Sequence, residues 1–318
     1  MSESSTVPTR LAPWIGPGFI LLFALSQALR DVYFGGVFQG VHPFVAILMA
    51  FAISVLVCAY LTVLRTPGQI GLARREGRTF VWMNVTTAMA WSSYFFALKY
   101  LQPSVVNTLH SAIGPLTVVV LGAFGVHIAQ KSTTQPLERL CYVGLAASIA
   151  ALWWVTLSGR SGLTEGDLPT VLGSLALLLV SGTSITISLL LSKRMNDRGI
   201  GTDAVTAGRY LMIIVIAIVA LASRPDSIGV TSANQFFVLL AASVVLIALP
   251  LYMLQMGIAR TASALTGHVI RSLGPVFIFA LELVDGRIHY STATLACIVV
   301  YSFFAIGSNV VRGWDRSA

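Results

Sequence analysis

Two apolar stretches of the sequence contain basic side chains beside a Gly-Pro pair. Residues 108–115 read TLHSAIGP and include His110, and residues 268–275 read HVIRSLGP and include His268 and Arg271. The guanidinium group of arginine is a planar fork that can hold a carboxylate through two hydrogen bonds. A histidine can donate hydrogen bonds to a bound solute or titrate near neutral pH. Charged groups inside a bilayer are costly and usually face a cavity or a partner, so these residues are candidates for substrate contact.

Each of these residues also has a purely structural interpretation. Arg271 could pair with Glu282 or with backbone carbonyl groups, and either histidine could be a core residue whose hydrogen bonds are satisfied. Two histidines in matching segments favour a cavity role for both, and Arg271 is our first choice for substrate contact.

Aromatic and amide side chains recur at helical spacing on neighbouring apolar stretches. Residues three or four positions apart share one face of a helix. Aromatic rings with polar edges suit a small organic solute with a flat or apolar side chain, although tight helix packing and interfacial anchoring are alternatives. The candidates for substrate contact beside Arg271, His268 and His110 are Asn107, Trp91, Tyr94, Asn84 and Tyr252.

Other charged or helix-bending residues are candidates for moving parts. Arg30 and Asp31 form either a gate or an ordinary interfacial ion pair; with Glu282 and the two histidines, Asp31 motivates a hypothesis of proton coupling. Arg209 could extend its charged end to the inner surface, which favours a structural role. Proline removes a helical hydrogen bond and glycine lets a neighbour approach. A hinge or cavity-shaping role is therefore predicted for Gly114, Pro115, Gly274 and Pro275.

The composition requires a membrane around these residues. The 318-residue chain is 56% hydrophobic and 10% charged, and its mean hydropathy is +0.83. A soluble domain carries about 25% charged residues, so this chain could not cover a surface that faces water. Cys58, Cys141 and Cys297 lie in apolar runs and have neither metal-ligand nor disulfide spacing. We predict an all-α polytopic membrane protein with no cofactor and no metal.

Hydropathy, helix breakers and charges divide the chain into ten candidate transmembrane helices. A transmembrane helix needs about 20 predominantly apolar residues. The predicted spans are 13–33, 42–64, 80–98, 103–125, 138–157, 168–192, 204–223, 234–256, 262–283 and 290–310.

The loops between these spans carry unequal positive charge. With the N-terminus inside, the outer loops hold only Lys99, Arg160, Arg224 and Arg287. The inner segments hold Arg10, Arg65, Arg74, Arg75, Arg78, Lys131, Arg139, Lys193, Arg194, Arg198, Arg260, Arg312 and Arg316. This bias predicts that both termini lie in the cytoplasm. It also accounts for the net charge of +8 without a nucleic-acid partner.

A shift of 160 residues aligns the two halves of the chain. It places Gly114-Pro115 on Gly274-Pro275 and pairs the first four predicted spans with spans six to nine without a gap. Each half contains five spans, an odd number, so the second half enters the membrane inverted. We therefore divide the chain at 1–160 and 161–318, two inverted five-helix repeats around a central cavity.

The segments FALKYLQPSVVNTLHSAIGPLTVVVLGAF (96–124) and QMGIARTASALTGHVIRSLGPVFIFALEL (255–283) share one pattern. Each has a short loop, a helix start rich in small residues and a proline in mid-helix. With the ten spans, this pattern resembles the drug/metabolite transporter superfamily, whose members have two EamA-type repeats of five helices. Within the superfamily the chain is similar to bacterial exporters of aromatic amino acids. The resemblance implies a transporter that binds its substrate between the repeats.

The functional hypothesis is a secondary transporter that exports amino acids, aromatic ones among them, and related small organic solutes across the bacterial inner membrane by alternating access. The alternative is a phosphorylated-metabolite or multidrug transporter of the same fold; a phosphorylated substrate should require several cavity-facing basic residues, and Arg271 alone stands out. Enzyme motifs such as HExxH and GxSxG are missing, so we predict that the protein is not an enzyme. A sensory or binding protein is disfavoured by the duplication. The expected partners are a small-molecule substrate and the lipid bilayer; we expect a monomer and leave oligomers open.

Overall fold

The computed structural model describes residues 12–34, 41–124, 136–161, 167–223, 229–230, 232–261, 270–271, 273–285 and 291–314. Every named element in these ranges is a helix, in agreement with the predicted all-α class. The α-helices are α1 (Ala12–Leu29), α3 (Pro43–Arg65), α4 (Gly68–Arg75), α5 (Gly77–Tyr100), α6 (Pro103–Ala123), α7 (Pro136–Leu157), α8 (Leu168–Asp197), α9 (Thr202–Arg209), α10 (Leu211–Ser223), α11 (Ala233–Ser243), α12 (Leu249–Arg260), α14 (Gly274–Asp285) and α15 (Thr292–Trp314). Two π-helices, η1 (Arg30–Phe34) and η4 (Val244–Ala248), continue α1 and α11.

Seven helical stretches of the described chain are long and apolar enough to cross a membrane. They are Trp14–Val32, Pro43–Arg65, Pro103–Ala123, Pro136–Leu157, Leu168–Asp197, Thr202–Ser223 and Ala233–Arg260. Each coincides with one of the ten predicted spans. The predicted spans 80–98, 262–283 and 290–310 are not in this group, although α5 is 24 residues long and Thr292–Ser308 is a shorter apolar helix. These helices confirm a multi-pass membrane protein.

The distribution of side chains is that of a protein surrounded by lipid. Large apolar side chains face outward; Phe124 is 82% exposed and Phe303 is 72% exposed. Several charged side chains lie inside, among them Asp31 and Arg209, which are at most 1% exposed. A soluble monomer rarely exposes large contiguous apolar patches, whereas a bilayer covers them. The interior of this bundle therefore contains the groups that can do chemistry.

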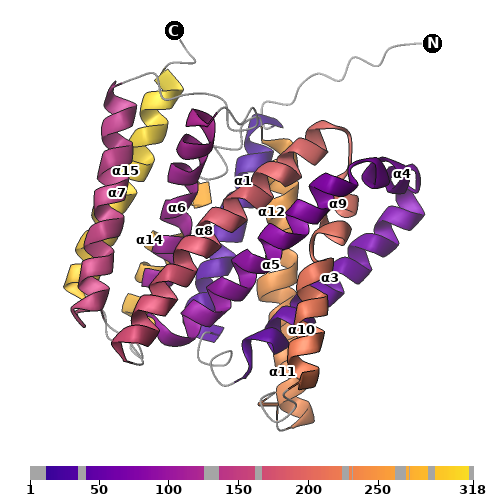
Figure 1. The fold of residues 1–318 in the computed structure, drawn as a ribbon, viewed down its shortest axis with the longest axis horizontal. Helices are drawn as coiled ribbons and strands as arrows, with labels where there is room; N and C mark the ends of the chain where they lie inside the picture. Colours follow the sequence, from indigo (N-terminus) through magenta and orange to yellow (C-terminus); the bar gives the residue numbers. More distant parts are fainter. Residues whose placement is uncertain are drawn as a thin grey trace.

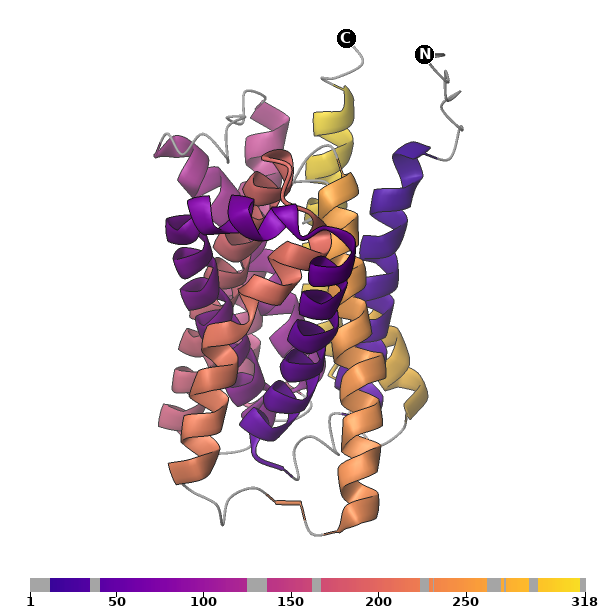
Figure 2. The same cartoon turned by 90° about the vertical axis from the view of Figure 1, so that its right-hand side faces the viewer.

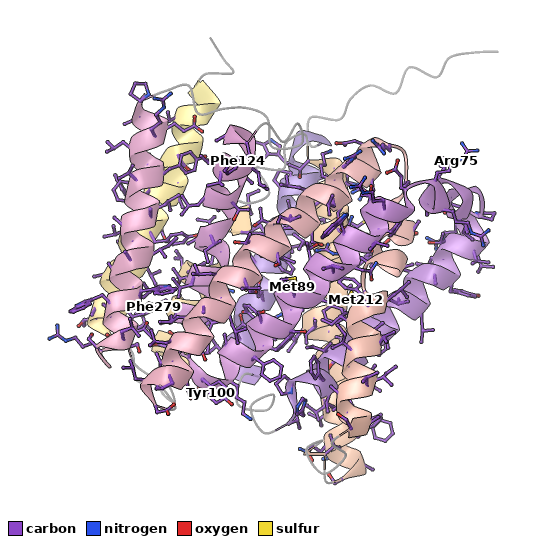
Figure 3. All side chains as sticks on the ribbon, viewed as in Figure 1. Arg75, Met89, Tyr100, Phe124, Met212 and Phe279 are labelled. Atoms are coloured by element: carbon purple, nitrogen blue, oxygen red, sulfur yellow. The ribbon has the colours of Figure 1, made fainter. Side chains whose placement is uncertain are left out.

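The helices form one bundle in which distant parts of the chain lie together. Figure 1 shows α7 and α15 side by side at one edge of the molecule, and α3, α10 and α11 towards the other. Between them, α5 packs on α8, α1 packs on α12, and α6 packs on both α8 and α14. The start of α1 and the end of α15 lie at the same end of the bundle (Figure 2). Arg75 lies towards that end and Tyr100 towards the opposite end (Figure 3).

Polar contacts join α4, and Glu76 immediately after it, to the segment between α8 and α9. Glu76 forms a salt bridge with Arg198, at the end of α8. This hydrogen bond from Arg198 holds the pKa of the Glu76 carboxyl below its ordinary value. Gln69 Oε1 on α4 accepts a hydrogen bond of 2.6 Å from the backbone N–H of Gly201.

The crossing of α1 and α12 depends on two glycines. A Cβ atom on Gly257 would lie 2.5 Å from Ile20 Cγ1 and 2.9 Å from the carbonyl oxygen of Gly16. A Cβ atom on Gly16 would lie 2.6 Å from Thr261 Oγ1 and 3.0 Å from the carbonyl oxygen of Arg260. Small residues allow this close approach, because helices in a membrane associate through direct packing.

A Gly16→Leu substitution should therefore separate α1 from α12 and destabilise the fold. Overpacking costs about 1–3 kcal/mol, and more where backbone atoms must move. Thermal unfolding in detergent should show a lower midpoint for Gly16→Leu than for the wild type. Gly18→Leu is the matched control, since a Cβ atom at Gly18 meets nothing within 4 Å. Equal midpoints for the two variants would contradict the proposed role of the crossing.

One membrane-crossing helix is broken in its interior. The stretch Thr202–Ser223 consists of α9 and α10, and Tyr210 between them is not α-helical. Asn84 on α5 satisfies backbone groups at the break: its Nδ2 donates to the Gly208 carbonyl at 2.6 Å, and its Oδ1 accepts from the Met212 N–H at 3.0 Å. Broken helices persist within a membrane only where other groups satisfy the freed backbone. This break sets the position of Arg209, the last residue of α9.

Candidate functional site

A buried carboxylate, Asp31, lies at the centre of the polar interior. Its Oδ1 accepts a hydrogen bond of 2.7 Å from Arg30 Nε, and the two side chains form a salt bridge. Its Oδ2 accepts from the Tyr94 hydroxyl at 2.5 Å and from Asn107 Nδ2 at 3.4 Å. Arg30 and Gln27 also donate to the Tyr94 hydroxyl oxygen. We call Arg30, Asp31, Tyr94 and Asn107 the Asp31 network; it connects the end of α1 to α5 and α6.

The π-helical end of α1 allows two adjacent residues to face inward. Successive side chains of an α-helix point about 100° apart, and a π-helix, with its i→i+5 hydrogen bonds, turns less per residue. Arg30 and Asp31 are accordingly both buried. The Arg30 guanidinium also lies 5.3–5.8 Å from the ring centroids of Trp91, Tyr94 and Phe95, which adds a favourable cation–π interaction. The pair therefore lies inside the helix bundle, and both the gate and the interfacial ion pair remain open.

The hydrogen bonds of His110 assign one neutral tautomer. Ser181 Oγ donates its only proton to the carbonyl oxygen of Ala90 at 2.7 Å. The contact of 2.9 Å between Ser181 Oγ and His110 Nδ1 therefore requires the histidine proton on Nδ1. His110 Nε2 is then an acceptor, and Arg271 Nη2 lies 3.2 Å from it. The ring packs edge-on against Tyr94, with a centroid distance of 4.8 Å, so His110 connects Arg271 to the Asp31 network.

Arg271 is buried, at 6% exposure, and its described hydrogen bond is to a neutral group. Its guanidinium lies 5.8 Å from the ring centroid of Phe23, and its Nε has no hydrogen-bond partner in the described part of the chain. The structural alternative, in which Arg271 pairs with Glu282, does not match the observed contacts. Glu282 accepts instead from Gln102 Nε2 and from the backbone N–H of Ser104, both at 3.0 Å.

Glu282 caps a helix from outside that helix. Gln102 and Ser104 flank the first residue of α6, where backbone N–H groups lack partners within the helix. A carboxylate from α14 satisfies one of these groups and interacts favourably with the positive end of the helix dipole. The gate or coupling role predicted for Glu282 therefore has a structural alternative in the observed contacts.

Arg209 differs from its sequence prediction. It does not extend to the inner surface: it is 1% exposed, and the prediction was wrong because interior partners on α5 and α12 hold its guanidinium. Its Nε donates to Thr87 Oγ1 and its Nη1 donates to Gln255 Oε1, both at 3.2 Å. Thr87 Oγ1 also lies 2.6 Å from Ser188 Oγ on α8. We call Thr87, Ser188, Arg209 and Gln255 the Arg209 network; it connects α5, α8, α9 and α12.

The other predicted residues fall into separate places. Trp91 belongs to the interior; it lies one helical turn from Thr87 and packs against Tyr94, with ring centroids 5.9 Å apart. Asn84 hydrogen-bonds backbone groups at the α9–α10 break. Tyr252 donates a hydrogen bond of 2.7 Å to Asp203 Oδ1. His268 lies outside the described residues.

The two Gly-Pro pairs have different surroundings. Gly114 and Pro115 are buried within α6, which is continuous from Pro103 to Ala123. Gly274 and Pro275 instead begin α14, where proline needs no intrahelical hydrogen bond. A Cβ atom on Gly274 would lie 2.9 Å from Asn107 Oδ1, so this glycine allows α14 to approach the Asp31 network.

A groove of about 670 Å³ lies apart from this interior. Its lining comes from α3, α4, α5, α9 and α10 and is mainly aliphatic, with Asn84 and Arg74 among the exceptions. None of the residues of the Asp31 network lines it. The groove therefore offers an apolar surface rather than the charged chemistry of the centre.

Comparison with solved structures shows the fold alone. A chain described only as "Crystal structure of protein" superimposes with a TM-score of 0.64 and 19% sequence identity, over 94% of this chain and 96% of that one. No protein-family model matches the sequence. No curated protein matches it either.

The interior as a whole suits recognition of a polar solute. Cationic and hydrogen-bonding groups from α1, α5, α6, α8, α9 and α12 and from the residues before α14 converge between aromatic rings. Such groups in a membrane bundle mark solute or ion pathways.

Proposed function

We propose that this protein is a secondary transporter that exports amino acids, including aromatic ones, and related small organic solutes across the bacterial inner membrane. The observation that carries the proposal is the buried Arg271, whose described hydrogen-bond partner is the neutral His110. A guanidinium in this state can bind a substrate carboxylate through its remaining N–H groups. Trp91 and Tyr94 nearby supply rings for an apolar or aromatic side chain.

Irregular helices support the transport mechanism. The α9–α10 break and the π-turn η1 place Arg209, Arg30 and Asp31 in the interior. Transporters commonly bind their substrates at discontinuous helices near the centre of the membrane. Movement of packed halves around such a site provides alternating access.

Helix contacts support two inverted repeats. The shift of 160 residues pairs α1 with α8, α5 with α12, α6 with α14 and α7 with α15. The contact of α5 with α8 then has its counterpart in α12 with α1, and the contact of α6 with α8 has its counterpart in α14 with α1. The contact of α6 with α7 corresponds likewise to that of α14 with α15. We therefore propose ten membrane passes: the seven apolar stretches, α5, the predicted span 262–283, which overlaps α14, and α15.

Positive charge supports cytoplasmic termini. The ends of α3, α4, α8 and α12 that carry Arg65, Arg75, Arg194 and Arg260 belong to the same side of the proposed topology as the start of α1. Lys99, near the end of α5, belongs to the opposite side. An excess of Lys and Arg marks the cytoplasmic side.

Reconstituted liposomes provide the test. The purified protein should accelerate the entry of radiolabelled amino acids relative to protein-free liposomes, and sugars should enter at the protein-free rate. A proton-coupled mechanism predicts that an imposed pH gradient changes the accumulated amount; equal accumulation with and without the gradient would favour facilitated diffusion. Acceleration of sugars or drugs but no amino acid would contradict the proposed substrate class.

A further inference from the structure

Two buried arginines in the described structure lack an acidic partner. The salt bridges among the described residues join Arg30 with Asp31, Lys193 with Asp197 and Arg198 with Glu76. Arg209 and Arg271 belong to none of them, although they are 1% and 6% exposed. Their described hydrogen bonds go to neutral groups of Thr87, Gln255 and His110. A buried cation with only neutral partners is strongly unfavourable, so the interior favours binding of negative charge.

Four unsatisfied groups on or beside these arginines are hydrogen-bond donors. Arg209 Nη2, Gln255 Nε2, Arg271 Nε and Trp91 Nε1 are buried and have no hydrogen-bond partner in the described part of the chain. Gln255 directs its carbonyl oxygen to Arg209, which leaves its amide N–H groups unpaired. Buried donors in native proteins are nearly always satisfied. The complementary ligand is therefore a group rich in acceptors.

One face of α5 relates the two arginines in space. Thr87, Trp91 and Tyr94 follow one another at helical spacing on this face. Arg209 binds Thr87, and Arg271 binds His110, which packs against Tyr94. Thr87 and Tyr94 are about 10 Å apart along the helix axis, at 1.5 Å per residue. Both arginines therefore lie beside the same face of α5.

The occupied oxygens of Asp31 favour an anionic ligand over a zwitterion. Both oxygens of Asp31 are occupied, by Arg30 on one side and by Tyr94 and Asn107 on the other. The ammonium of a neutral amino acid would therefore compete for an acceptor already in use. One carboxylate would neutralise only one of the two arginines.

We propose that Arg209 and Arg271 together bind an organic dicarboxylate, one acidic group at each guanidinium. An anion with two separate acidic groups brings one counter-charge, through charge-assisted hydrogen bonds, to each guanidinium. Short dicarboxylates, with the acidic amino acids among them, meet this requirement. A phosphate ester, whose charges lie on one group, does not. This proposal rests on the proposed transport function and makes dicarboxylates the preferred ligands of the site, with neutral amino acids as weaker ones.

Thermal unfolding of the detergent-purified protein tests binding separately from transport. Succinate, glutarate and glutamate should each raise the unfolding midpoint, because they bind the folded state. Butyrate, phenylalanine and glycerol phosphate at equal ionic strength should raise it less. Equal effects of succinate and butyrate, or no effect of any dicarboxylate, would overturn the proposal.

Arg209→Gln separates anion binding from a structural role. The affinity for succinate should fall about 10- to 100-fold, as expected for the loss of hydrogen bonds to a charged group. Without an anion, the midpoint of Arg209→Gln should equal or exceed that of the wild type, because an uncompensated charge has been removed. A merely structural Arg209 would give a lower midpoint and an unchanged succinate effect. Arg65→Gln, at an exposed arginine, is the matched control and should leave the succinate effect unchanged.

Two outcomes distinguish the dicarboxylate site from the transport function. If phenylalanine crosses reconstituted liposomes and succinate neither binds nor competes, transport stands and the dicarboxylate site is refuted. If succinate binds in an Arg209-dependent way but no solute crosses, the site stands and the transport function is refuted. Should Arg209→Gln fail to fold, the shifts of the unfolding midpoint by succinate and by butyrate still test the site. They are then measured on the wild type and on Arg209→Lys, since lysine retains the charge.

Discussion

An Asp31→Asn variant should lose about 3–5 kcal/mol of unfolding free energy, the cost of removing one partner from a buried ion pair. The neutral amide would leave the Arg30 guanidinium buried without a counter-charge. Its NH₂ group would also face donors, since the carboxylate accepts from Arg30, Tyr94 and Asn107 in the wild type. Unfolding of the purified variant in detergent, followed by tryptophan fluorescence against denaturant, measures the loss.

The same substitution at an exposed ion pair is the control. Asp197 pairs with Lys193 at 2.7 Å, but its side chain is 58% exposed. An exposed pair of this kind contributes about 0.3–0.5 kcal/mol, so Asp197→Asn should change stability little. The double variant Arg30→Gln/Asp31→Asn removes both charges and should recover part of the loss. Equal stability of Asp31→Asn and Asp197→Asn would refute the central structural role of Asp31.

The Asp31 variant also bears on the gating hypothesis. A carboxylate held by three donors and a salt bridge is well suited to fixing the end of α1 against α5 and α6. A coupling group, in contrast, must exchange protons during transport. If Asp31→Asn folds with wild-type stability but no longer responds to a pH gradient, proton coupling is the better account.

Patterns within single helices predicted much of this site. Asn107 and His110 are three residues apart, so the sequence alone places both on one face of α6, and both are buried. The pairing of Arg30 with Asp31 was predictable because the residues are adjacent. Charge inside apolar stretches is a strong signal, since a membrane permits it only at high cost.

Contacts across the chain were not predictable in the same way. Arg209 is held in the interior by Thr87 and Gln255, which are 122 and 46 positions away in the sequence. A hydropathy profile averages over the α9–α10 break and therefore predicts one continuous helix. The polar amide of Asn84 in an apolar stretch suggested a ligand-binding role, yet this side chain hydrogen-bonds backbone groups at that break. Ser181 carries no distinguishing sequence signal, because serine recurs in the run SGTSITIS, and only the fold brings it to His110.

Arg271→Gln should reduce the uptake of amino acids by at least about 30-fold. Removal of one partner from a buried, hydrogen-bonded charge pair costs 2 kcal/mol or more, and 1.4 kcal/mol corresponds to a factor of about ten. Initial rates in reconstituted liposomes measure the effect. Arg271→Lys should retain part of the activity, because lysine keeps the charge but loses the planar fork. Arg65→Gln removes an exposed charge and should transport like the wild type.

The solute itself separates substrate contact from a role in positioning His110. If Arg271 binds the substrate carboxylate, Arg271→Gln should raise the KM of phenylalanine far more than that of phenethylamine, which has no carboxylate. If Arg271 only holds His110 through its 3.2 Å contact, both solutes should lose the same factor. A His110→Gln variant extends the comparison, because its effect on the two solutes should then match that of Arg271→Gln. A folded Arg271→Gln protein that transports phenylalanine at the wild-type rate would exclude substrate contact by this arginine altogether.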